Sequence, residues 1–223
     1  SIAIAAREKG MTEMYVPKEN AEEVSLIPGL TIFPVETLSE AIDHLSGDPR
    51  KRISSHIRAP KQGRLETNDL SDIRGQETAK RGLEIAIAGG HNIALWGPPG
   101  TGKTMLARAA ASLLPPLTED EMIEVTSIHS LAGTVRGVIT EPPFRSPHHT
   151  ASYPSLIGGG NFPRPGEVTL AHRGVLFLDE FPEFHRDVIN ALREPLEDAR
   201  ITVARARGTC TFPANFIMIA ALN

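Results

Sequence analysis

The chain has 223 residues, of which 40% are hydrophobic and 22% charged, and a formal net charge of −4 at pH 7. This composition is typical of a globular protein, and its negative charge excludes a general attraction to nucleic acid, so any such contact must come from local basic clusters. The single cysteine, Cys210, excludes an internal disulfide and a metal site built on several thiolates. The first residues lack the pattern of a signal peptide, and no apolar run approaches the roughly 20 residues of a membrane span. We therefore expect a cytoplasmic protein with no membrane partner.

Residues 1–47 alternate helical and strand patterns and predict a small α/β unit. Strands are expected near residues 13–16 and 30–35, and they should pair in parallel because a helical segment separates them. A capping-box pattern opens a last helix, in which Ile42 and Leu45 are expected to face inward. Two strands bury too little surface to be stable alone, so we expect this unit to be the end of a larger domain.

Residues 48–68 include a basic run. Six lysines and arginines lie between Arg50 and Arg64 with no acidic residue among them. Such a run is usually a solvated linker, and a contact with nucleic acid is the alternative.

A phosphate-binding loop pattern, G-x-x-x-x-G-K-[ST], lies between an apolar run at residues 92–96 and a helical pattern at residues 105–114. In such a loop the glycines let successive backbone N–H groups turn toward phosphates, Lys103 reaches the β and γ oxygens, and Thr104 ligates Mg²⁺. A helix that begins near Lys103 adds its dipole and its unpaired N–H groups at the anion. We therefore predict ATP and Mg²⁺ as ligands. The residues of the loop are Gly97, Pro98, Pro99, Gly100, Thr101, Gly102, Lys103 and Thr104.

A second apolar run, residues 175–178, ends in Asp179 and Glu180, which is how a buried parallel strand delivers acids to its carboxyl end. We assign Asp179 to the magnesium ion and Glu180 to the attacking water. A third apolar run, residues 216–222, ends at Asn223. Its amide is a candidate to hold the same water or the γ-phosphate, and ordinary turn chemistry is the alternative.

The stretch from Pro142 to Pro165 contains six prolines and the glycine run 158–160. Long regular elements are not expected in it, and a connection of this length is usually functional or mobile. The glycines would permit movement, or act only as a linker. His148 and His149 also lie here, without a cysteine or a cluster of acids, so we expect them to position the loop by hydrogen bonds and not to bind a metal.

Residues 201–212 alternate in polarity on both sides of Arg207 and Gly208, which predicts a β-hairpin. Arg205 and Arg207 are two residues apart and so share one face of the hairpin. They are candidates for contacts with DNA phosphates, and arginines on a merely exposed face are the alternative.

The order of these motifs resembles that of the AAA+ ATPases, with the phosphate loop similar to Walker A, Asp179 and Glu180 to Walker B, and Asn223 to sensor 1. Within that superfamily the chain resembles the magnesium-chelatase-like branch, and most closely the competence protein ComM/YifB family. The segments that carry this second resemblance are residues 144–150, 158–160, 165–167 and 170–174.

The resemblance implies an α/β fold in which residues 69–223 form an AAA+ P-loop core, a central parallel sheet flanked by helices. Residues 1–47 are similar to the end of a ribosomal-S5/Lon-protease-like domain, and residues 48–68 would link the two. The family's helical lid, its sensor arginine and its arginine finger would lie beyond residue 223. We therefore expect these residues alone to bind nucleotide poorly and to hydrolyse it slowly.

The resemblance also implies a homo-hexamer with ATP bound between subunits and a pore that engages DNA. The favoured interpretation is an ATP-hydrolysing motor subunit that remodels or translocates DNA, a branch-migration-type helicase in recombination or natural transformation. One alternative is the ATPase subunit of a chelatase that inserts Mg²⁺ into a porphyrin, which the S5/Lon-like segment and the arginine hairpin disfavour. The other is a nucleotide-gated scaffold, which has no need of Glu180.

Overall fold

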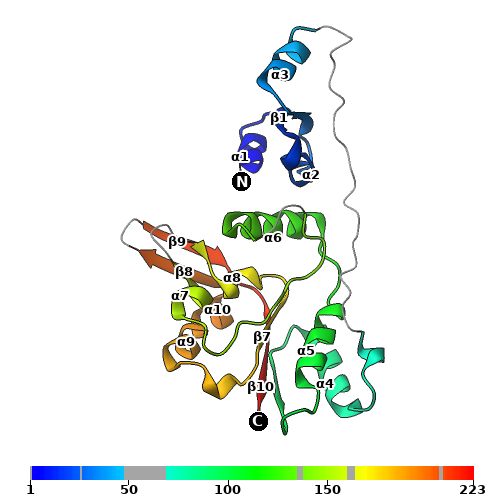
Figure 1. The fold of residues 1–223 in the computed structure, drawn as a ribbon, viewed down its shortest axis with the longest axis vertical. Helices are drawn as coiled ribbons and strands as arrows, with labels where there is room; N and C mark the ends of the chain where they lie inside the picture. The colour runs from blue at the N-terminus through cyan, green and yellow to red at the C-terminus, as the bar shows by residue number, and fades with distance from the viewer. Residues whose placement is uncertain (1, 26, 48–68, 135–137, 160–163, 206–207) are drawn as a thin grey trace.

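The computed structural model describes residues 2–25, 27–47, 69–134, 138–159, 164–205 and 208–223 (Figure 1). The basic run at residues 48–68, Arg207 and the side chain of Arg205 lie outside the described part, so the predictions made for them stay predictions. The described residues include no helix that is long and apolar enough to cross a membrane.

The N-terminal unit contains two parallel strands with helices beside them, which confirms the predicted pairing. Val16, Ala21 and Ile32 form its small core. Its elements are α1 (Ile2–Glu8), β1 (Glu13–Pro17), η1 (Lys18–Asn20), α2 (Ala21–Val24), β2 (Thr31–Val35) and α3 (Leu38–Leu45).

The expected orientation of α3 is wrong, because Ile42 and Leu45 are 57% and 70% exposed. The helix presents His44 to the strands instead. The His44 ring lies 4.6 Å from the ring of Phe33, and its Nδ1 lies 2.9 Å from the hydroxyl of Tyr15. An aromatic contact and a hydrogen bond on one residue thus decide which face of the helix packs.

The main unit is built on a four-stranded parallel sheet in the order β3-β10-β7-β4. The last strand in the sequence therefore lies in the middle, and all four carboxyl ends meet at one edge of the sheet (Figure 1). The strands are β3 (Ile93–Trp96), β4 (Phe144–Arg145), β7 (Val175–Leu178) and β10 (Ile217–Leu222).

Helices cover both faces of this sheet, with α4 and α5 on one side and α7, α9 and α10 on the other (Figure 1). Two short hairpins, β5–β6 and β8–β9, accompany the second layer. The remaining elements are η3 (Leu70–Asp72), α4 (Glu77–Gly89), α5 (Lys103–Ser112), α6 (Glu119–Ala132), α7 (Tyr153–Ile157), β5 (Gly158–Gly159), β6 (Arg164–Pro165), α8 (Glu167–Leu170), η4 (Phe181–Glu183), α9 (Arg186–Ala191), α10 (Arg193–Asp198), β8 (Arg200–Arg205) and β9 (Gly208–Pro213).

The apolar run of β7 is explained by burial on both faces. Val175 and Phe177 pack against α4 and α5, whereas Leu176 and Leu178 pack into the core under α7 and α9. Successive side chains of a strand point to opposite faces, so a strand covered on both sides must be apolar throughout. This three-layer arrangement confirms the predicted α/β class.

Gly174 allows β7 to begin directly against Pro143. A Cβ at position 174 would overlap the carbonyl oxygen of Pro143 and lie 2.7 Å from its nitrogen. The backbone cannot move apart easily there, because the N–H of Val175 donates to that same carbonyl oxygen at 2.8 Å.

We therefore expect Gly174→Ala to lower the free energy of unfolding by about 1–3 kcal/mol or more, as overpacking against backbone does. Gly82→Ala is the matched control. Gly82 lies inside α4, and a Cβ at this position would meet only Cδ1 of Ile93, at 3.7 Å. Alanine in a helix should stabilise by about 0.5–1 kcal/mol. Urea denaturation measures both, and equal stability of the two variants would contradict this account of Gly174.

Candidate functional site

The phosphate-loop pattern lies between β3 and α5, as predicted, and its conformation requires glycine at two positions. Gly100 and Gly102 have φ angles of 79° and 85°, a region that residues with a Cβ rarely occupy. The Thr101 hydroxyl donates to the carbonyl oxygen of Pro98 at 2.9 Å and braces the turn. The backbone between these glycines is thus held in a tight curve at the start of α5.

The ammonium group of Lys103 joins this loop to the end of β10. Its Nζ donates to the carbonyl oxygens of Gly97 and Pro98 and, at 2.8 Å, to Oδ1 of Asn223. A lysine ammonium has three donors, and these three acceptors use all of them. The contact brings the predicted Walker A lysine and the predicted sensor residue together.

Thr104 and Asp179 are also in direct contact, because the Thr104 hydroxyl donates to Oδ2 of Asp179 at 3.0 Å. The other carboxylate oxygen, Oδ1, accepts the backbone N–H of Glu180 at 3.0 Å. A hydroxyl and a carboxylate side by side are the hard oxygen ligands that Mg²⁺ takes. The residue pair therefore fits the predicted metal position.

Glu180 has a left-handed backbone, with φ 52° and ψ 44°, which costs a non-glycine residue about 1–2 kcal/mol. The turn directs the chain from β7 into η4 and leaves the Glu180 side chain half exposed. Strain of this kind is common at functional positions and is tolerated where the surrounding structure fixes it.

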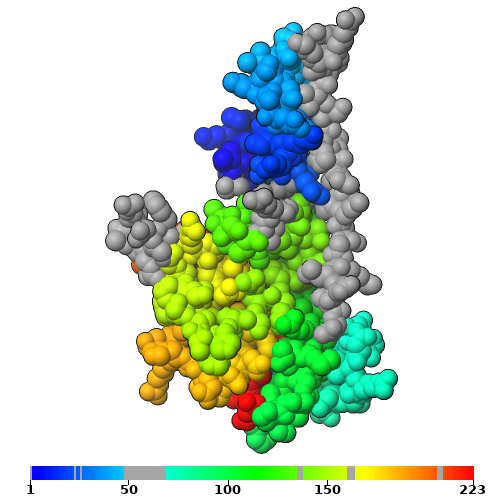
Figure 2. Space-filling model, viewed as in Figure 1, coloured from blue at the N-terminus to red at the C-terminus, as the bar shows by residue number. Residues whose placement is uncertain are grey.

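Most of the predicted nucleotide-site residues line one pocket of about 380 Å³ at the carboxyl edge of the sheet, and Gly97 and Pro98 of the loop are not among them. The C-terminal end of the chain, in red, lies beside the green segment near residue 100 at the lower end of the molecule (Figure 2). Backbone donors, an ammonium group and a hydroxyl–carboxylate pair fit a nucleotide with its magnesium ion. The lining residues are Pro99, Gly100, Thr101, Gly102, Lys103, Thr104, Met105, Asp179, Glu180 and Asn223.

His149 contacts this site, which the sequence did not reveal. Its Nδ1 lies 2.9 Å from Oε2 of Glu180. The sequence suggested only that the histidine pair positions its own loop, which His148 does through Thr150. The sequence does not reveal the order of the strands in the sheet. Because β4 pairs with β7, the loop after β4, with His149, lies beside the loop after β7, with Glu180.

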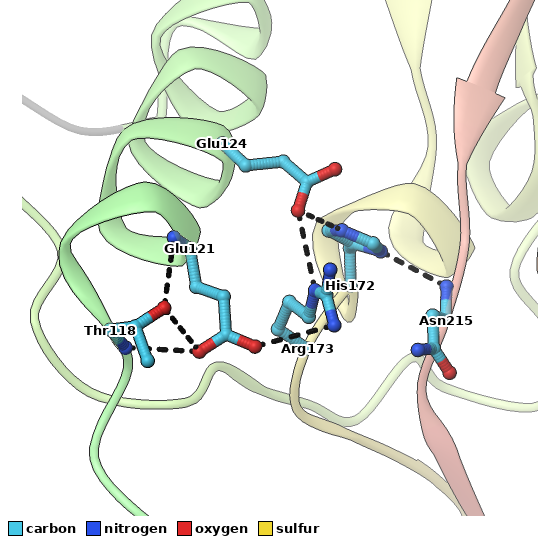
Figure 3. A network of polar contacts seen from close by, with 6 residues as sticks. All are labelled: Thr118, Glu121, Glu124, His172, Arg173 and Asn215. Atoms are coloured by element: carbon cyan, nitrogen blue, oxygen red, sulfur yellow. Dashed lines mark hydrogen bonds and ion pairs between the residues drawn. The ribbon is translucent and has the colours of Figure 1, made fainter.

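The opposite edge of the sheet carries a polar network that joins the amino ends of β7 and β10 (Figure 3). The Asn215 N–H donates to Nδ1 of His172 at 3.0 Å, and the Arg173 N–H donates to the Asn215 carbonyl oxygen at 2.6 Å. Glu124 on α6 lies 3.0 Å from Nε2 of His172 and accepts from Nε of Arg173 at 3.2 Å. Glu121, from the capping box that begins α6, pairs with Arg173 at 3.3 Å.

Burial sets the protonation of this network. Burial of the His172 ring lowers its pKa, and this outweighs the opposite effect of the neighbouring Glu124 carboxylate. Burial raises the pKa of Glu124, but the hydrogen bonds and charges of His172 and Arg173 lower it by more. His129 on the same helix is also buried, which lowers its pKa. Two contacts therefore link α6 to the rest of the unit: Glu124 lies 3.0 Å from Nε2 of His172, and Nε2 of His129 lies 3.0 Å from the carbonyl oxygen of Leu170.

The β5–β6 hairpin does not use Gly158 as a free hinge. Gly158 is buried with φ 116°, and a Cβ there would come within 3.3 Å of Val203 on β8 as well as overlapping Arg164. Gly159 pairs with Arg164. Gly158 is thus required for close packing, whereas movement of the glycine run stays a prediction; Gly160 lies outside the described residues.

A family model described as magnesium chelatase, subunit ChlI, matches residues 69–223. The chain belongs to this family. It is 45% identical over 226 residues to the competence protein ComM of Haemophilus influenzae, covering 99% of this chain and 44% of that protein. It is 48% identical over 212 residues to the protein YifB of Salmonella typhimurium, covering 93% of this chain and 41% of that one. These identities assign it to the ComM/YifB group of magnesium-chelatase-like AAA+ proteins, although it spans less than half the length of either relative.

A solved structure supports the same fold. The complex between the BchI and BchD subunits of magnesium chelatase aligns with a TM-score of 0.54 and 24% identity, over 68% of this chain and 53% of that one. At this identity the likeness shows the AAA+ fold and not a shared activity.

We expect acid to destabilise the folded chain through its two buried histidines, His129 and His172. Because the pKa values of His129 and His172 are lowered in the folded state, the unfolded chain takes up protons that the folded chain does not as the pH falls below about 6.5. We expect each histidine to reduce the free energy of unfolding by up to about 1.4 kcal/mol one pH unit below that value.

Urea denaturation at pH 7.5 and 5.5 measures this loss. His172→Asn keeps an acceptor for the Asn215 N–H but cannot titrate, so its stability should depend less on pH. The exposed His91 provides the control, and His91→Asn should leave the pH dependence unchanged. An unaltered pH dependence in His172→Asn would contradict the assignment.

Proposed function

We propose that the chain is the nucleotide-binding part of an ATP-hydrolysing motor subunit that remodels or translocates DNA. The observation that carries the ATPase part is the convergence in one pocket of Lys103 with Asn223 and of Thr104 with Asp179, at 2.8 and 3.0 Å. Residues from three separate strand ends meet there with the donors and acceptors that a magnesium nucleotide needs.

The proposed roles follow from the chemistry of each group. Lys103 and the loop N–H groups bind phosphate oxygens, Thr104 and Asp179 hold Mg²⁺, and Asn223 binds the γ-phosphate. Bound Mg²⁺ supplies neutralisation of the phosphate charge. Glu180 orients the attacking water and accepts its proton, while the water oxygen bonds to the γ-phosphorus and the bond to the bridging oxygen breaks to release ADP.

DNA as the substrate of the motor is supported by the relatives and by the hairpins. ComM of H. influenzae, 45% identical, is named a competence protein. The β8–β9 hairpin packs through Val203 against Gly158 of β5. The sequence predicts Arg205 and Arg207 as its phosphate contacts, although Arg207 and the side chain of Arg205 lie outside the described residues. We propose a homo-hexamer with ATP between subunits and these two hairpins at the DNA-binding pore.

A metal-chelatase ATPase subunit is the second candidate, favoured by the description of the matching family model and by the BchI–BchD structure. Its ATP site would be the same. The two functions differ in what stimulates hydrolysis, which makes them separable by experiment.

Replacement of Glu180 tests its proposed role in ATP hydrolysis. Glu180→Gln in the full-length protein should lower kcat for ATP hydrolysis at least about 100-fold with ATP binding retained, because the amide cannot accept the proton. Lys103→Ala should weaken ATP binding itself. Glu183→Gln is the control, an exposed acid three residues along the chain that should leave hydrolysis unchanged. Retained hydrolysis in Glu180→Gln would remove that residue from its role.

Stimulation of ATP hydrolysis by DNA tests which substrate the motor acts on. We expect ATP hydrolysis by the full-length protein to increase when single-stranded or branched DNA is added. Stimulation by a porphyrin-binding partner and indifference to DNA would favour the chelatase, and no turnover under either condition would favour a nucleotide-gated scaffold.

A further inference from the structure

Arg145 and Glu167 form a bidentate ion pair. Nε of Arg145 donates to Oε2 of Glu167 at 2.6 Å, and Nη2 donates to Oε1 at 2.7 Å. The two side chains are 30% and 21% exposed, so solvent screens their charges only in part. Two parallel charge-assisted hydrogen bonds fix the orientation of the partners as well as their distance. The pair is therefore a directional contact between two segments of the chain.

This ion pair closes the base of a long insertion in the sheet. Arg145 is the last residue of β4, which runs parallel to β7 with Arg145 beside Leu176. Glu167 is the first residue of α8, which only Gly166 separates from β6. The two partners are 22 residues apart in the sequence. The pair thus ties the end of the β5–β6 hairpin segment to the strand beside β7.

A close approach of two backbones joins the β5–β6 hairpin to the start of α8. A Cβ at Gly166 would lie 2.5 Å from the backbone nitrogen of Gly158 and 2.6 Å from the carbonyl carbon of Ile157. Gly158 pairs with Pro165 across the hairpin. Only a residue without a Cβ fits at position 166, so the hairpin is held directly against the residue that precedes Glu167.

The β5–β6 and β8–β9 hairpins belong to one packed unit, the hairpin body, which also includes α7 and α8. Gly158 on β5 lies against β8, since a Cβ there would come within 3.3 Å of Cγ2 of Val203. α7, α8 and the β8–β9 hairpin lie together and share one hydrophobic core (Figure 1). Close-packed groups transmit displacements to one another, so a movement of one hairpin should shift the other. Core residues from these elements include Leu156, Ile157, Val168, Ile201, Val203 and Phe212.

Arg145 connects this body to the strand that leads into the ATP site. The partner of β4, β7, is followed directly by Asp179, which lines the phosphate-loop pocket. The Val175 N–H at the start of β7 donates to the carbonyl oxygen of Pro143 at 2.8 Å and fixes β4 beside it. The apolar core under the hairpin body also reaches β7, but apolar contacts are non-directional. The ion pair with Glu167 therefore sets the orientation of the body against the sheet.

We propose that Arg145 and Glu167 are positioning residues that couple the two hairpins to ATP hydrolysis: the ion pair orients the hairpin body against the sheet, so that DNA bound at the hairpins changes the rate at the ATP site. The inference rests on the proposed function, since it requires DNA to stimulate hydrolysis. Neither residue lines the phosphate-loop pocket. Breaking the pair should therefore remove the effect of DNA and leave hydrolysis without DNA intact.

ATP hydrolysis by the full-length protein, with and without saturating single-stranded DNA, tests this coupling. Glu167→Gln removes one charge, and Arg145→Lys keeps the charge but loses the second parallel donor. We expect each variant to lower kcat at saturating DNA about 3- to 30-fold, toward the rate without DNA, as disrupted coupling between sites does. The kcat without DNA and the KM for ATP should equal the wild-type values.

Charge reversal separates the ion pair from the individual side chains. Arg145→Glu places two carboxylates together and should uncouple the hairpins, whereas Arg145→Glu combined with Glu167→Arg restores opposite charges and should recover part of the stimulation. If Arg145→Glu does not fold, Glu167→Gln and Arg145→Lys decide the question. The matched control is the Arg81–Glu84 pair on α4, which is 2.8 Å apart with side chains 72% and 47% exposed. Glu84→Gln should keep the wild-type response to DNA.

The outcomes separate this inference from the proposed function. If DNA does not stimulate the wild type, the proposed DNA motor is wrong and the coupling role is overturned with it. If DNA stimulates the wild type, Glu167→Gln and Arg145→Lys equally, the proposed function stands and only the coupling role is overturned. An equal loss of kcat with and without DNA would indicate a role in folding or in the ATP site, and it would also overturn the coupling role.

Discussion

The parallel pairing of β10 between β3 and β7 is the constraint on which the rest of this structure depends. β3 leads into the phosphate loop, Asp179 directly follows β7, and Asn223 directly follows β10. Since the carboxyl ends of parallel strands meet at one edge, a single strand order is enough to bring all three together. The hydrogen bonds from Lys103 to Asn223 and from Thr104 to Asp179 are consequences of that order.

The two edges of the sheet differ in their electrostatics. At the amino edge, His172 is almost fully buried and Glu124 and Arg173 are partly so; Nδ1 of His172 accepts the Asn215 N–H, Glu124 lies 3.0 Å from its Nε2, and Arg173 pairs with Glu124. Such a network fixes the register of β7 against β10, because a shift of either strand would leave buried polar groups without partners. At the carboxyl edge the polar groups remain more exposed and face a pocket. The network at the amino edge thus fixes the two strands whose carboxyl ends carry the residues of the pocket.

Glu180 illustrates how a half-exposed carboxylate is given a fixed place. Its backbone has left-handed φ and ψ angles, and its backbone N–H donates to Oδ1 of Asp179. Its side chain contacts His149, which lies in the loop after β4. Membership of the magnesium-chelatase-like AAA+ family is consistent with ATP chemistry at this position. The segment that follows His149 in the chain is also packed against the hairpins, with Gly158 against Val203 of the β8–β9 hairpin.

The sequence by itself determined the features that depend on neighbouring residues. The phosphate loop needs glycines at 100 and 102 for its backbone angles, Thr118 and Glu121 cap their own helix, and the apolar run 175–178 requires burial on both faces. Only the tertiary structure decided the contacts between distant segments. The partnership of His149 with Glu180, the network of Glu124 with His172, and the outward face of Ile42 all depend on strand order and helix rotation. These are set by the packing of residues far apart in the chain, and no local pattern encodes that packing.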